Sequence, residues 1–156
     1  MSTPNPHSDA REKGQSLVEM TIGFVILLII LMGLVDLGRA YLIYVALEES
    51  AGEGAIYLSI NPDCLTAADG PQCADPNNAE YRARNVGGQE VQWTSVNYAF
   101  TRTTPYGVGD PVSVEVKYAF PLLTPLISQI AGERGITLTA QASQIIISDK
   151  QIAGVP

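Results

Sequence analysis

The longest apolar stretch of the chain lies near its N-terminus. No charged residue occurs from Met20 to Val35, and Leu17, Val18 and Leu37 extend the run. About 19 apolar residues form a helix roughly 30 Å long, which matches the hydrocarbon core of a bilayer. The run is longer than the core of a cleaved signal peptide and has no obvious small-x-small cleavage site after it. The pattern therefore predicts a single transmembrane or filament-core helix.

The same helix is expected to continue well beyond the apolar run. No proline interrupts positions 7 to 61, and Asn61-Pro62 supplies a stop, so we expect a helix from about Gln15 to Ser59. Its second half is amphipathic, with apolar residues at helical spacing on one side and three glutamates on the other. We expect that apolar side to pack on a folded domain; its residues are Leu37, Tyr41, Tyr44, Val45, Leu47, Ala51, Ala55 and Leu58.

Glycines at positions 23, 33, 38, 52 and 54 lie inside this predicted helix. An interior glycine costs about 1 kcal/mol of helix stability relative to alanine. Two interpretations stay open. Either another helix approaches closely at these small residues and offsets the cost, or the glycines provide local flexibility without a partner.

The rest of the chain reads as loops and strands. Residues 1–14 are polar, contain two prolines and are expected to be a disordered leader. Alternation of apolar and polar residues is clearest from Val112 to Phe120, which predicts a strand with one buried face. The other expected elements are a loop over 63–88 with a short helix at Ala79–Asn85, strands at Gln89–Thr103 and Ile136–Ser148, a turn at Thr104–Pro111, and a short amphipathic helix at Pro121–Gly135, on the sheet or on the membrane surface.

These elements predict an α+β fold, in which a long N-terminal helix is followed by a small antiparallel β-sheet packed on its outer half. The expected divisions are a leader over 1–14, the helix over 15–60 with its first half in the membrane, and a β-rich domain over 61–156. The chain of 156 residues has room for one such domain once the membrane segment is set aside.

The charges indicate orientation and exclude one class of partner. Arg11 and Lys13 precede the apolar run and Arg39 follows it, which favours an N-terminus in the cytoplasm. We therefore expect a single-pass protein of the cytoplasmic (inner) membrane whose C-terminal domain is periplasmic or extracellular. A formal net charge of −7 and the lack of a basic cluster argue against binding to nucleic acid.

The two cysteines both lie on the predicted outer side. A disulfide closing the short loop between Cys64 and Cys73 fits an oxidising compartment, and two free thiols are the alternative.

Candidate catalytic and metal-binding patterns are weak. The sole histidine, His7, lies in the leader, so triads that need a histidine are lost if the leader is removed. The cysteines lack the paired spacing of a zinc site. Asp63, Asp69, Asp75 and Asn77 do not follow the ligand order of an EF-hand, which favours a solvated acidic loop over a calcium site. The sequence therefore predicts a protein that is not an enzyme and has no metal, cofactor or small-molecule substrate.

One short motif carries most of the functional information. Glu19 places a carboxylate in the first turn of the membrane run, a position that costs up to about 3 kcal/mol at the centre of a bilayer. Cleavage after Gly14 would give Gln15 a free ammonium group one helical turn from Glu19. That group, or the amine of a neighbouring subunit, would be a strong partner for the carboxylate.

This motif resembles the prepilin-peptidase site of type IV pilins and pseudopilins, in which a glycine precedes a glutamate by five positions and an apolar helix follows. The stretch from Arg11 to Met20, with Gly33, Arg39 and residues 51–55, resembles TadE-like proteins, the minor pilins or pseudopilins of the Tad (tight adherence) pilus system. The resemblance implies cleavage between Gly14 and Gln15 by a membrane aspartic peptidase.

The resemblance to TadE-like proteins also implies a structural role, in which Glu19 guides entry into a filament that serves adhesion or secretion. The implied partners are membrane lipid, the prepilin peptidase, other pilin subunits and the Tad assembly machinery.

Two alternatives accompany this interpretation. Glu19 could instead be a carboxylate that reaches the cytoplasmic interface without a role in assembly. The chain as a whole could be a single-pass membrane protein presenting a small extracytoplasmic binding domain. Asp36 and Arg39, three residues apart, are expected to form a local ion pair at the outer interface, with contacts between subunits as a second possibility.

Overall fold

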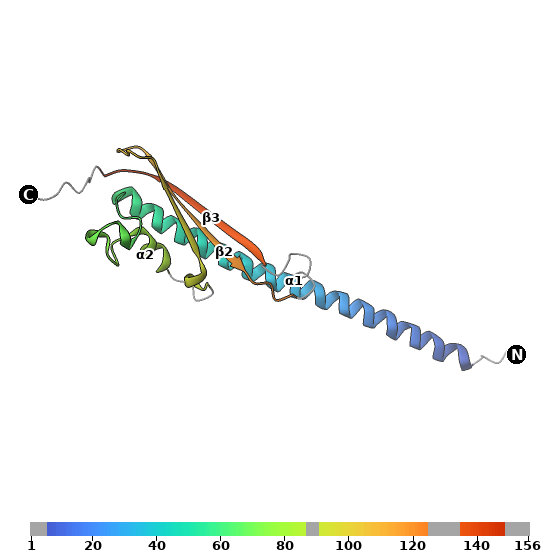
Figure 1. Cartoon of the computed structure of the whole chain (residues 1–156). Coiled ribbons are helices and arrows are strands. Elements are labelled where there is room, and N and C mark those ends of the chain that lie inside the picture. Colours follow the sequence, from blue (N-terminus) through green and yellow to red (C-terminus); the bar gives the residue numbers. More distant parts are fainter. Residues whose placement is uncertain (1–5, 87–90, 125–134, 149–156) are drawn as a thin grey trace, which may run out of the picture.

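The computed structural model describes residues 6–86, 91–124 and 135–148. Its dominant element is one helix, α1 (Pro6–Ile60), of 55 residues. The N-terminal half of α1 projects as a single rod, whereas the outer half lies under the sheet and beside α2 (Figure 1). The helix ends directly before Asn61-Pro62, as predicted, because the residue before a proline is disfavoured in the helical conformation. The predicted α+β fold, a long apolar helix followed by a small antiparallel sheet, is confirmed.

The predicted start of the helix is wrong. We expected it near Gln15 after a disordered leader, but α1 already begins at Pro6, so residues 6–14 are helical. The sequence contains the reason. Proline is well suited to the first position of a helix, and the segment from Ala10 to Lys13 consists of strong helix formers.

The sheet has three antiparallel strands in the order β1-β2-β3, namely β1 (Asn97–Arg102), β2 (Pro111–Phe120) and β3 (Ile136–Ile145). The central strand alternates as predicted. Its inward side chains are at most 6% exposed: Val112, Val114, Val116, Tyr118 and Phe120. They pack with α1 into a single apolar core.

Two strands are shorter than expected. The strand predicted from Gln89 starts only at Asn97, because Trp93–Ser95 forms the 3-10 turn η3. The last strand leaves the sheet after Ile145, and the N–H of Ile147 donates to the carbonyl of Ser59 at 2.9 Å. This bond ties the end of β3 to the end of α1. The helix predicted at Pro121–Gly135 lies mostly outside the described residues; 121–124 are not helical.

Only part of the predicted apolar face of α1 is buried. Of the predicted residues, Leu47, Ala51, Ala55 and Leu58 are buried, each at most 1% exposed. Ile43, which was not predicted, is also buried at 3% exposure. Leu37 and Tyr41, which we expected in the core, are 67% and 66% exposed. The outer half of the helix carries apolar residues on more than one side, and the sheet covers a single side of it.

The short helix α2 (Ala79–Arg84), close to its predicted bounds, packs on α1 at a glycine. A Cβ added to Gly54 would lie 3.4 Å from Cβ of Ala83 and from a methyl of Val114. The hydroxyl of Ser50 donates to the carbonyl of Ala83 at 2.7 Å. Close approach within the chain therefore accounts for Gly54.

Candidate functional site

The N-terminal half of α1 is an extended, exposed apolar surface. Every residue from Gly14 to Met32 is exposed. One described helix is long and apolar enough to cross a membrane. Its most apolar segment has a mean hydropathy of 2.6, and none of the residues in that segment is buried. A soluble domain would not leave so many consecutive apolar residues in water. This half of the helix therefore fits a lipid bilayer or the centre of a helical assembly.

Gly14, Gln15 and Glu19, the residues of the predicted processing motif, lie on this exposed rod. Gln15 Nε2 donates to Glu19 Oε1 at 3.4 Å, so the two side chains share one face of the helix. Among the side chains described from Gly14 onward, no cationic group pairs with Glu19. A hydrogen bond from a neutral amide is a weak partner for a carboxylate at the start of an apolar run, so the site retains capacity for a positive charge.

The packing of the described residues does not require a glycine at position 14. A Cβ added to Gly14 would meet no described atom within 4 Å, and the same holds for Gly23, Gly38 and Gly52. Gly54 thus serves a contact inside the chain. Gly23, Gly38 and Gly52 meet no described neighbour, so a partner helix outside the chain and local flexibility both stay open for them.

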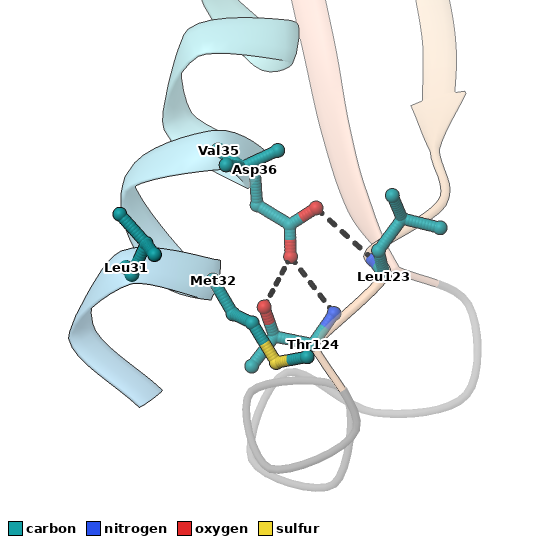
Figure 2. Close-up of a pocket in the computed structure, with 6 residues that line it drawn as sticks. All are labelled: Leu31, Met32, Val35, Asp36, Leu123 and Thr124. Atoms are coloured by element: carbon teal, nitrogen blue, oxygen red, sulfur yellow. Dashed lines mark hydrogen bonds between the residues drawn. The ribbon is translucent and has the colours of Figure 1, made fainter. Parts of the chain in front are cut away.

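A second site lies where the rod meets the rest of the molecule. Asp36, the first charged residue after the apolar run, is 3% exposed although it belongs to α1. Its Oδ1 accepts from the backbone N–H of Leu123 at 3.1 Å, and its Oδ2 accepts from the N–H and the hydroxyl of Thr124 at 2.9 and 2.6 Å (Figure 2). We call this arrangement of Asp36, Leu123 and Thr124 the clamp.

Arg39 completes the charge balance at the clamp. Its Nη1 lies 3.5 Å from Oδ1 of Asp36, and its guanidinium carbon lies 5.3 Å from the ring centroid of Phe120. The ion pair is long and the arginine side chain is 38% exposed, so the three hydrogen bonds from Leu123 and Thr124 are the stronger contacts. The predicted i, i+3 pair is thus one side of a larger arrangement that also fixes the end of β2 against α1.

Sequence reasoning missed Leu123 and Thr124. The available signal was that a carboxylate at the end of an apolar run needs hydrogen-bond donors. Which donors supply the bonds was not visible, because they lie 87 and 88 residues further along the chain.

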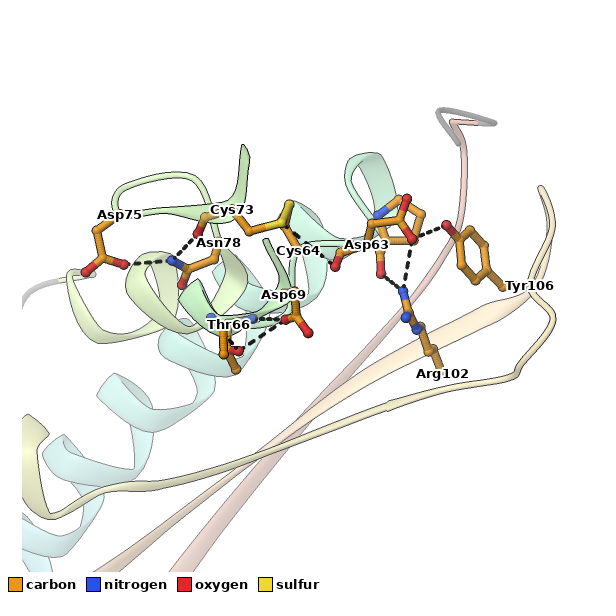
Figure 3. Close-up of a disulfide and its surroundings, with 11 residues drawn as sticks. Asp63, Cys64, Thr66, Asp69, Cys73, Asp75, Asn78, Arg102 and Tyr106 are labelled. Carbon is orange, nitrogen blue, oxygen red and sulfur yellow. Dashed lines mark hydrogen bonds and ion pairs between the residues drawn. A yellow bond between two sulfur atoms is a disulfide. The ribbon is translucent and has the colours of Figure 1, made fainter. Parts of the chain in front are cut away.

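We call the outer half of α1, together with α2 and the sheet, the head. At the end of the head opposite the clamp, Cys64 and Cys73 form a disulfide with a Cα–Cα distance of 5.1 Å (Figure 3). The side chain of Asn78 accepts from the N–H of Tyr81 at the start of α2, and its amide donates to the carbonyl of Cys73 at 2.9 Å. The disulfide loop is therefore anchored to α2.

The acidic residues of this loop have separate partners. Asp63 bonds with Arg102 and Tyr106 near the turn between β1 and β2, and Asp69 accepts from the backbone N–H of Thr66 at 2.6 Å. Asp75 accepts from Asn78 at 2.7 Å. Within the described ranges, no group of three or more His, Cys, Asp or Glu side chains is placed to hold a metal ion.

Burial is the main cause of a raised pKa at two tyrosines of the head. Burial raises the pKa of Tyr98 above its ordinary value of 10.0, with Ser50 and Arg84 opposing the shift. Burial likewise raises the pKa of Tyr57, and the nearby charge of Arg82 opposes it. Both phenols are therefore neutral at physiological pH and act as packing groups.

Comparison with known proteins supplies one match. Residues 14–55 match the family model described as TadE-like protein. No curated protein and no solved structure matches the chain. The matched segment begins at Gly14, contains Glu19, Asp36 and Arg39, and ends within the part of α1 that packs under the sheet. The resemblance to TadE-like proteins predicted from the sequence is confirmed over these residues.

Proposed function

We propose that this chain is a structural, pilin-like subunit of a Tad-type pilus, held in the cytoplasmic membrane by α1 and processed between Gly14 and Gln15. The observation that carries the proposal is the TadE-like match itself. It starts at Gly14, includes Glu19 and covers the whole exposed apolar run of α1. This structural role requires no catalytic residue of the chain.

The surroundings of Gly14 support processing by a peptidase. No described side chain needs a glycine there, yet glycine lowers helix stability by about 1 kcal/mol relative to alanine. The Gly14–Gln15 bond lies inside α1, so a peptidase has to open the helix locally before it binds the bond. A glycine surrounded by open space lowers the cost of that opening and leaves room for an enzyme.

The surroundings of Glu19 support a role in assembly. Cleavage after Gly14 would place a new ammonium group four residues from Glu19, at the end of the helix where a carboxylate is favoured by the dipole. Two unit charges at 4 Å attract by about 4 kcal/mol at an effective dielectric constant of 20. Glu19 can therefore recruit the amine of its own chain or that of a neighbouring subunit.

The first experiment tests processing in the native host. N-terminal mass spectrometry of the wild-type chain should find a mature protein that begins at Gln15. Gly14→Val should leave residues 1–14 attached, whereas Gly23→Val, at a second open glycine of the same rod, should be processed normally. An intact N-terminus on the functional wild-type protein would instead favour a single-pass membrane protein that presents a small binding domain.

A second experiment tests assembly after processing. Glu19→Ala should insert into the membrane and lose its leader, but its amount in sheared filaments should fall by about tenfold or more if the charge pair is worth at least about 1.4 kcal/mol. Glu53→Ala is the matched control, since Glu53 is also an exposed glutamate of α1. Equal incorporation of both variants would refute the role of Glu19.

A further inference from the structure

A pocket of about 270 Å³ opens directly beside the clamp. The carboxylate of Asp36 is turned toward the loop that follows β2, and the other walls are largely apolar (Figure 2). The lining residues are Leu31, Met32, Val35, Asp36, Leu123 and Thr124. Three of them belong to the apolar run of α1, so the pocket is continuous with the surface proposed to lie in the membrane.

The spacing of charges along α1 places this pocket relative to a bilayer. Glu19 and Asp36 bracket the apolar run, and the helix rises about 25 Å between them, slightly less than the hydrocarbon thickness of about 30 Å. Both carboxylates then lie close to the two boundaries of the hydrocarbon. Leu31 precedes Asp36 by five residues, which places it about 7 Å inside the outer boundary.

Leu123 adds a further exposed apolar side chain beside the pocket. It is 66% exposed although its backbone N–H is fixed by Asp36, so the clamp holds a large apolar side chain outward at the level of the boundary. Arg39 lies almost one helical turn beyond Asp36, on the side away from the apolar rod, and its side chain is 38% exposed. The apolar pocket walls lie on the membrane side and suit an acyl chain. The partly exposed cation of Arg39 lies on the outer side and suits the phosphate of the same phospholipid.

We propose that this pocket and Leu123 form a lipid-binding surface, in which a phospholipid of the outer leaflet places an acyl chain in the pocket and its phosphate near Arg39. The inference rests on the membrane anchor of the proposed function and adds a second contact with the bilayer, made by the head. The clamp satisfies the carboxylate at the boundary, so a lipid chain meets no unpaired charge.

Spin labelling of the full chain in phosphatidylcholine–phosphatidylglycerol vesicles tests this contact. The two native cysteines are joined to each other, so a nitroxide reacts with an introduced thiol. Labels are placed by Leu123→Cys, by Leu31→Cys on the rod, and by Val108→Cys, a similarly exposed residue of the turn between β1 and β2 at 60% exposure. The clamp uses the backbone of residue 123, so the first substitution keeps it.

Collision rates with oxygen and with a water-soluble nickel chelate give the depth of each label. We expect Leu123→Cys and Leu31→Cys to show loss of nickel accessibility, and Val108→Cys to stay accessible to nickel. A buried label at Leu31 with a water-exposed label at Leu123 would overturn the inference and leave the membrane anchor standing. Nickel accessibility at all three positions would refute the anchor as well.

The remaining competitor for the pocket is a second copy of the chain. Dilution of the protein in lipid should leave the spectrum of the Leu123→Cys label unchanged, because lipid is always in excess. Spin–spin broadening that persists on dilution would place another chain in the pocket and overturn the lipid assignment.

Discussion

Replacement of Asp36 by alanine tests the contact that joins the rod to the head. The carboxylate accepts three hydrogen bonds, two from backbone N–H groups and one from the hydroxyl of Thr124. Asp36→Ala removes both acceptor oxygens and therefore all three hydrogen bonds at once. The donors of Thr124 are then buried without a partner, since this residue is only 2% exposed.

The expected magnitude follows from these contacts. A hydrogen bond to a charged group contributes about 1.5 kcal/mol or more, so three of them contribute about 4–5 kcal/mol. The ion pair with Arg39 adds little, because it is 3.5 Å long and its arginine side chain is 38% exposed. Alanine recovers about 0.5 kcal/mol as a better helix former. The docking of residues 121–124 on α1 should therefore weaken by about 4 kcal/mol.

Hydrogen exchange in detergent micelles or nanodiscs measures this change where it occurs. Because 1.4 kcal/mol corresponds to a factor of ten, the amides of Leu123 and Thr124 should exchange several hundred times faster, on the order of 500-fold, in Asp36→Ala. Thr124→Val removes the hydroxyl bond alone and should accelerate exchange by about tenfold.

Arg39→Gln is the matched control at the clamp. It leaves the carboxylate and its three donors in place and should change exchange by less than about fivefold, the effect of an exposed ion pair. Unchanged exchange in Asp36→Ala, or an equal effect of Arg39→Gln, would show that the carboxylate does not fix the end of β2.

Three further predictions concern the head and are measured by urea or alkaline unfolding of the solubilised chain. Replacing Cys64 and Cys73 together by serine opens a loop with a sequence separation of 9 and should lower the free energy of unfolding by about 3 kcal/mol; a loss below about 0.5 kcal/mol would mean that the disulfide does not constrain the unfolded chain. Gly135→Ala should lower the free energy of unfolding by about 2 kcal/mol, because Gly135 has φ +69° and a Cβ there would collide with the carbonyl of Phe120. Gly38→Ala, on the open helix surface, should instead raise it by about 0.5–1 kcal/mol, and equal effects of the two substitutions would refute the strain argument. The folded pKa of Tyr98 is raised, so the folded state holds its proton longer than the unfolded chain and stability falls as pH rises above 10.0; Tyr98→Phe should lose less stability in that range, and identical alkaline profiles would contradict the assigned shift.

Patterns between near neighbours in the sequence were sufficient for the elements themselves. The uncharged run from Met20 to Val35 predicts a membrane-length helix because length and apolarity are local properties. The alternation from Val112 to Phe120 predicts β2 because side chains alternate across any strand. The early start of α1 at Pro6 has a local cause too, because helix formers from Ala10 to Lys13 outweigh the polar composition of the leader.

Contacts between distant segments could not be predicted in the same way. The outer half of α1 offers apolar residues on more than one side, and only the docked sheet buries Leu47 and leaves Tyr41 exposed. Helix glycines look alike in the sequence, yet Gly54 lies against Ala83 while Gly23 faces open space. Each distinction depends on a neighbour that the chain brings in from far away.

The sequence by itself determined the rod, the Gly14–Glu19 motif and the central strand, because each is encoded within a few consecutive residues. The tertiary structure decided what Asp36 does. A carboxylate at the edge of an apolar helix requires donors, and folding brings them from Leu123 and Thr124, more than eighty residues away. Hydrogen-bond partners at that separation are set by the packing of the sheet on α1, which no local pattern specifies.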